Sequence, residues 1–150
     1  MKKRTMMCRA RQPLAGALFV AVLAGPAHGF DAYGEWRGQV QYVVTKHGQR
    51  EPSIQEVVPL VVRVEPGGKV VGSSSENGCR LLGMASPVET NVMRLDVTLR
   101  GCESVELNRR LSGTLAFYPA DGRLALNAAL RDANAKPVTR YEVAAPILRR

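Results

Sequence analysis

The chain has 150 residues, with 21 basic and 13 acidic side chains, and a formal net charge of +8. Five of the basic residues lie within the first 11 positions, so 16 basic and 13 acidic side chains follow position 29, a net charge of +3. This ordinary surface charge argues against nucleic acid as a partner. The 121 residues after position 29 are enough for one domain with a modest core.

The first 29 residues have the pattern of an export signal. A basic segment precedes the apolar run 14–25, Pro26 follows, and Ala27-His28-Gly29 supplies small residues at a cleavage site. We therefore expect residues 1–29 to be removed and a single β domain to span residues 30–150. The apolar run is too short to cross a bilayer, and no second candidate segment follows it. We expect an exported protein, periplasmic or extracellular, without a transmembrane segment in the mature chain; a retained N-terminal anchor is the alternative.

Apolar and polar residues alternate through most of the remaining chain, which is the period of a β-strand with one buried face. The clearest case is 92–100, where Met93, Leu95, Val97 and Leu99 share one phase. In chain order, the expected strands are 35–45, 57–65, 69–75, 79–85, 92–100, 111–118, the segment containing Leu124, Leu126 and Leu130, and 138–145. The core is expected to include Leu95, Val97, Leu99, Leu115, Phe117 and Leu126.

About eight consecutive strands with mostly short connections predict an all-β antiparallel meander. Closing the meander into an up-and-down barrel would remove exposed strand edges, so a closed or nearly closed barrel is favoured. A two-sheet β-sandwich is the alternative. The longer connections are 46–56, 101–110 and 131–137, and loops on a rigid β scaffold are where binding residues are expected.

Glycine-containing turns at 66–69, 76–79 and 120–123 are suited to hairpins with two-residue loops. Such loops would place Val64 opposite Val71, Ser73 opposite Leu82, Val71 opposite Met84, and Phe117 opposite Leu126. Facing residues share one side of a sheet, so this register puts Leu82 and Met84 in the core and leaves Leu81 outside.

Two cysteines, Cys79 and Cys102, remain after the signal segment. An even number in an oxidising compartment predicts a structural disulfide. If the two cysteines are directly opposite, Leu82 pairs with Leu99 and Met84 with Val97, and the cysteines lie on the outer face. A metal or redox pair is disfavoured, because His47 is the only histidine after position 29 and no Cys-x-x-Cys is present.

Gly34-Glu35-Trp36, at the start of the first strand, is similar to the Gly-x-Trp that opens lipocalin- and avidin-type (calycin-type) barrels. The resemblance implies a β-barrel in which Trp36 plugs one end, and it implies no ligand or partner.

No catalytic constellation, metal site, phosphate-binding loop or calcium loop is found in the sequence, so neither an enzyme nor a bound cofactor is expected. The prediction is a non-enzymatic binding protein of the cell envelope that docks an envelope or secreted protein through its loops, as inhibitors and immunity-type proteins do. The candidate contacts are His47, Arg109 and Arg110. A carrier of a small apolar ligand inside the barrel and a structural envelope protein are the alternatives, and the oligomeric state is left open.

Overall fold

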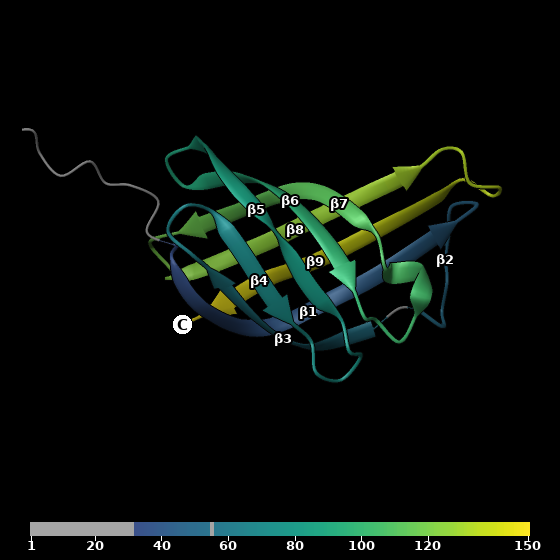
Figure 1. The fold of residues 1–150 in the computed structure, drawn as a ribbon, viewed down its shortest axis with the longest axis horizontal. Helices are drawn as coiled ribbons and strands as arrows, with labels where there is room; N and C mark the ends of the chain where they lie inside the picture. Colours follow the sequence, from purple (N-terminus) through teal and green to yellow (C-terminus); the bar gives the residue numbers. More distant parts are fainter. Residues whose placement is uncertain (1–31, 55) are drawn as a thin grey trace, which may run out of the picture.

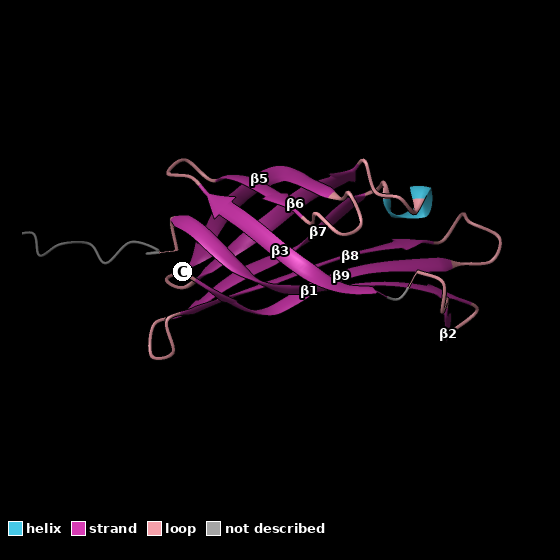
Figure 2. Cartoon of the chain, turned by 90° about the horizontal axis from the view of Figure 1, so that it is seen from below, coloured by secondary structure: helices cyan, strands magenta, loops and turns pink. Residues whose placement is uncertain are grey.

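A computed structural model describes residues 32–54 and 56–150 as one antiparallel β-barrel (Figures 1 and 2). The expected signal segment, 1–29, and the cleavage before Phe30 lie outside the described residues. The strands follow one another around the barrel, and pairing of the last strand with the first closes the ring. The eight strands of the ring are β1 (Gly34–Lys46), β3 (Glu56–Val64), β4 (Lys69–Ser73), β5 (Arg80–Glu89), β6 (Val92–Arg100), β7 (Arg110–Tyr118), β8 (Arg123–Asp132) and β9 (Thr139–Arg149).

A two-residue strand, β2 (Gln49–Arg50), pairs with the end of β1, and a 3-10 helix, η1 (Val105–Leu107), lies between β6 and β7. The expected up-and-down barrel is therefore confirmed, and the two-sheet sandwich is not formed. Each of the eight strands pairs with two neighbours, which removes most of the unpaired backbone groups that the two edges of an open sheet would expose.

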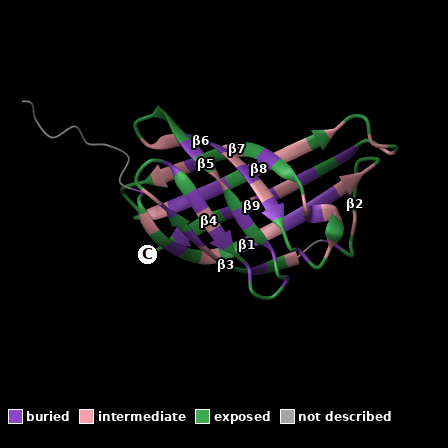
Figure 3. Ribbon diagram, in the orientation of Figure 1, coloured by how far each residue is buried: buried purple, intermediate pink, exposed green. Residues whose placement is uncertain are grey.

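The alternation read from the sequence is confirmed where it is strongest. In β3 the side chains of Val58, Leu60, Val62 and Val64 are buried, and in β6 those of Met93, Leu95, Val97 and Leu99 are buried (Figure 3). Leu115 and Leu126, also expected in the core, are fully buried. Phe117 differs from the expectation, because it is half-buried and packs against the core from its margin.

The β3–β4 hairpin corrects the predicted register. Val64 lies opposite Val70 instead of Val71, because the Glu65 amide donates to the Lys69 carbonyl and leaves a three-residue loop. Gly67 and Gly68 both have positive φ in this loop. One additional loop residue shifts the pairing by one position, and such a shift turns the next strand over. Val70 therefore points inward and Val71 outward.

The reversal passes to β5, since Val71 pairs with Leu82. Leu81 is 1% exposed, whereas Leu82 and Met84, expected in the core, are 42% and 52% exposed. Across the next ladder Leu81 faces Leu99 and Gly83 faces Val97, so the pairings expected for Leu82 and Met84 are wrong.

The other two turns change the partners without changing the faces. Ser73 lies opposite Arg80 instead of Leu82, and Phe117 lies opposite Leu124 instead of Leu126. In both hairpins the partner is displaced by two positions from the expected one, and a shift of two positions preserves the inward phase. The leucines of β8 consequently remain in the core as expected.

Trp36 closes one end of the barrel. Its side chain is buried, and its indole N–H donates to the Ala32 carbonyl at 2.8 Å. The Phe117 ring packs edge-on against the indole at 5.9 Å between centroids, and the Arg150 guanidinium lies 4.9 Å from the indole centroid. We call this the Trp36 end. The opposite end, which carries residues 47–54 and the connections 74–79, 101–109 and 133–138, is called the loop end (lower middle to right in Figure 1).

Candidate functional site

The three predicted contact residues all lie at the loop end. This follows from the meander, because successive connections alternate between the two ends of an antiparallel barrel. His47 and Gly48 form the two-residue turn between β1 and β2, with φ of 52° and 77°. Two positive φ values in a two-residue loop are typical of a type I′ hairpin turn. The hairpin holds the exposed His47 at the tip of the barrel wall.

Arg109 and Arg110 point in different directions. The Arg109 guanidinium carbon lies 5.5 Å from the centroid of the buried Tyr141 ring, and its Nη1 donates to the Asn108 carbonyl. Arg110 begins β7 opposite Thr98 and is exposed on the outer wall. The two arginines therefore contribute to separate surfaces, one at the mouth of the barrel and one on its side.

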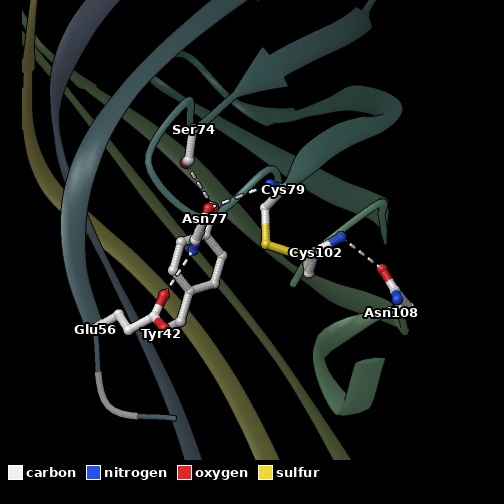
Figure 4. The surroundings of a disulfide bond; sticks show 7 residues. All are labelled: Tyr42, Glu56, Ser74, Asn77, Cys79, Cys102 and Asn108. Atoms are coloured by element: carbon white, nitrogen blue, oxygen red, sulfur yellow. Dashed lines mark hydrogen bonds between the residues drawn. A yellow bond between two sulfur atoms is a disulfide. The ribbon is translucent and has the colours of Figure 1, made fainter. Parts of the chain in front are cut away.

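The disulfide between Cys79 and Cys102 is formed, as predicted (Figure 4). Both cysteines are buried, which corrects their expected position on the outer face. The bond joins the β4–β5 connection to the β6–β7 connection, immediately beyond the last pair of the ladder, Arg80 and Arg100. It thereby links two of the loops at the loop end.

Side-chain amides secure the backbone around the disulfide (Figure 4). The Asn77 carbonyl oxygen accepts from the Cys79 amide at 3.2 Å, and its amide nitrogen donates to Glu56 at 3.0 Å. The Asn108 side chain accepts from the Cys102 amide at 3.1 Å. Buried polar groups need such partners, so these residues serve to hold the loops in place.

An ion pair ties η1 to the barrel wall. The Lys46 ammonium lies 2.8 Å from one Glu106 carboxylate oxygen and 3.9 Å from Glu51. The hydrogen bond to Glu106 raises the pKa of Lys46 above its ordinary value. Leu107, next to Glu106, is buried and packs onto the core, so the 3-10 helix covers part of the mouth of the barrel.

Tyr42 and Ser74 make a buried polar contact under the loop end, with their hydroxyl oxygens 2.9 Å apart. Burial raises the pKa of the Tyr42 hydroxyl above 10.0; the nearby Glu56 carboxylate adds to this rise, and the hydrogen bond with Ser74 opposes it. The folded state therefore favours the neutral hydroxyl. This contribution to stability is complete below the unfolded pKa near 10 and is lost as the pH rises through the folded pKa.

Replacing Tyr42 by phenylalanine is expected to lower the free energy of unfolding at pH 7 by about 1–3 kcal/mol, because Ser74 loses its buried partner. The difference between the wild type and Tyr42→Phe should narrow above pH 10, since only the wild type has the buried hydroxyl to ionise. Urea unfolding between pH 7 and pH 11 measures both effects, with the exposed Tyr118→Phe as the control. A difference that is independent of pH would contradict the assignment.

The interior of the barrel is filled by its own side chains. Its largest members, Trp36, Tyr42, Leu60, Leu81, Met93, Leu95, Leu99, Leu107, Leu111, Leu115, Leu124 and Leu126, are each less than 2% exposed. A water-sized space beside any of them would leave part of its surface accessible. The hollows described in the structure are lined mainly by residues of the outer wall and of the two ends.

Within residues 32–54 and 56–150, no helix is long and apolar enough to span a membrane, and no three His, Cys, Asp or Glu side chains are grouped to hold a metal ion. No protein-family model matches the chain, and no curated protein or solved structure does either. The closed antiparallel barrel of eight strands is compatible with the barrel that the resemblance at Gly34-Glu35-Trp36 implies.

The sequence did not identify the arginines that cross-strand pairing brings together. Arg80 lies directly opposite Arg100 on one side of the barrel, and Arg131 lies directly opposite Arg140 on another. The members of each pair lie on different strands, so no local motif marks either pair. The only signal available from the sequence is an outward-phase arginine near the end of each strand.

Proposed function

We propose that this chain is an exported, non-enzymatic binding protein of the cell envelope that docks a partner protein through the loop end. One observation carries the proposal: the longer connections lie at one end of a filled barrel, where a disulfide and side-chain hydrogen bonds hold two of them, 74–79 and 101–109. A surface that is ordered before binding loses less conformational entropy on association. The structural disulfide also supports an oxidising compartment, where such bonds persist.

The composition of the loop end suits a protein partner. Val105 on η1 is 74% exposed and Val138 beside β9 is 45% exposed, so two apolar side chains project from the end that also carries His47 and Arg109. Arginine is enriched among residues that dominate binding energy, and apolar contacts supply the desolvated centre of an interface. The side chains of Tyr42, Asn77 and Glu106 are engaged in hydrogen bonds that stabilise the fold. Their use in structural contacts favours docking of a partner over catalysis at this end.

Reversing the charge of both arginines, Arg109→Glu with Arg110→Glu, is expected to weaken capture of the partner from an envelope extract. The loss should be larger at low salt than at high salt, because exposed charges are screened by ions. Lys69→Glu with Arg37→Glu, both at the strand ends near Trp36, changes the net charge equally and is the matched control. Quantitative pull-downs at two salt concentrations measure the effect, and thermal melting verifies that both variants fold.

Native mass spectrometry, together with the pull-downs and thermal melts, distinguishes docking of a partner protein from carriage of an apolar ligand. Native mass spectrometry of the purified protein should show the mass of the chain alone, since the interior is filled. A co-purifying apolar molecule that raises the melting temperature, with no effect of the arginine changes, would contradict the proposal and favour a carrier.

A further inference from the structure

Three arginines form one row across the outer wall at the loop end. Arg131 of β8 lies opposite Arg140 of β9, Arg140 lies opposite Thr45 of β1, and Thr45 lies opposite Arg50 of β2. Directly paired residues share one face of a sheet, so the three arginines and the threonine are neighbours on the same surface. All three arginines are exposed.

A hollow of about 540 Å³ lies over the part of this row formed by Thr45, Arg140 and Arg131, between the β1–β2 hairpin and the end of the β8–β9 pair. It is lined by Thr45, His47, Gly48, Arg131, Val138 and Arg140, and none of these carries a negative charge. Figure 1 shows the two hairpins side by side, extending at the same end of the barrel. The type I′ turn at His47 and Gly48 fixes one side of the hollow.

The positive charge of the hollow is only partly compensated. Arg140 is paired with Glu142 of the same strand at 2.8 Å. Within the part of the chain that the structure describes, Arg131 and Arg50 have no acidic partner within ion-pair distance. Like charges directly opposite each other destabilise a sheet, so this row lowers the stability of the folded protein when no anion is bound. An anion placed between the guanidinium groups would remove this repulsion.

We propose that this hollow is a binding site for a dianionic oxyanion, that is, a phosphate group, held between Arg131 and Arg140. The planar guanidinium group donates two parallel hydrogen bonds to oxyanions, and the Thr45 hydroxyl is a further donor beside Arg140. The three arginines of the row, Arg50, Arg131 and Arg140, set against Glu142 leave a net charge of +2, which favours a doubly charged ligand over a monocarboxylate. The site needs no protein partner, so it goes beyond the function proposed above and stands independently of it.

Inorganic phosphate is the probe. In a titration of the ¹⁵N-labelled protein at constant ionic strength, the amide resonances of Thr45, His47, Gly48, Arg131 and Arg140 are expected to shift and to saturate. Arg131→Gln and Arg140→Gln should each weaken phosphate binding about tenfold or more, the range for a lost charge-assisted hydrogen bond. Arg100→Gln is the matched control, because it breaks the other opposed arginine pair, whose members do not line this hollow; it should leave phosphate binding unchanged.

Thermal melting gives an independent readout. Phosphate should raise the melting temperature of the wild type, and it should raise that of Arg131→Gln much less. In phosphate-free buffer Arg131→Gln should melt no lower than the wild type, because the substitution relieves repulsion; a residue with only a structural role would melt lower. His47→Asn removes the imidazole but keeps a residue that tolerates positive φ, so the turn is preserved. The same melts of this variant measure whether the imidazole contributes to phosphate binding.

The proposal is overturned if chloride produces the same shifts at equal ionic strength, or if acetate binds as tightly as phosphate. It is also overturned if Arg131→Gln and Arg140→Gln, both folded, bind phosphate like the wild type. Loss of partner capture in the preceding experiment has no bearing on these outcomes, so the two proposals fail separately.

Discussion

Replacing Leu81 by alanine is expected to destabilise the protein by about 2–5 kcal/mol, whereas the same replacement of Leu82 should cost no more than about 1 kcal/mol. The two leucines are adjacent in β5 and identical in type, but Leu81 is 1% exposed and Leu82 is 42% exposed. Leu81 pairs with Leu99 inside the barrel, so its truncation leaves a cavity among side chains that cannot fully close around it. Leu82 has solvent on one side, and truncating it creates no cavity.

Urea unfolding of the two variants measures this difference, with Leu99→Ala as the reference for a core position. The register decides which alternate residues of β5 point into the barrel, so the comparison tests the register of β4 and β5 together. A larger loss for Leu82→Ala than for Leu81→Ala would show that Leu82 points inward, as two-residue turns predict, and would contradict the register of β4 and β5.

Removing the disulfide is expected to have a comparable effect. The double variant Cys79→Ser with Cys102→Ser should lose about 2–5 kcal/mol of unfolding free energy, as small disulfide-bonded domains do. The bond spans 23 residues and fixes two loops, and both sulfur atoms belong to buried side chains. The unfolded chain becomes freer, and two loops of the native state lose the link between them.

Serine adds a second penalty, because a buried hydroxyl needs a hydrogen-bond partner. Cys79→Ala with Cys102→Ala is therefore the matched control, and it should lose less than the serine pair while remaining clearly below the wild type. Denaturant unfolding of the three proteins gives the comparison. Exchange of the backbone amides at positions 79 and 102 should accelerate in both variants, since these amides donate to the side chains of Asn77 and Asn108 beside the bridge. A stability equal to that of the wild type in the alanine pair would show that the bridge contributes nothing.

The sequence determined the fold class and most of the core. The strong alternations of β3 and β6 predicted which side chains are inward, because the period of two is a local property of an extended strand. The consecutive order of short strands favoured an antiparallel barrel, and the pair of cysteines predicted the disulfide. The positions of His47, Arg109 and Arg110 at one end followed from strand order alone.

Only the tertiary structure decided which face each weaker strand presents and which residues meet across strands. The β3–β4 connection has three loop residues where two were expected, and that single residue reversed Val70, Val71, Leu81 and Leu82. The length of a loop depends on glycine conformation and on contacts with neighbouring strands, as at Gly68, whose carbonyl accepts from the Ala85 amide. The opposed arginines of β8 and β9 have the same origin, because cross-strand neighbours are set by register and not by proximity in the chain.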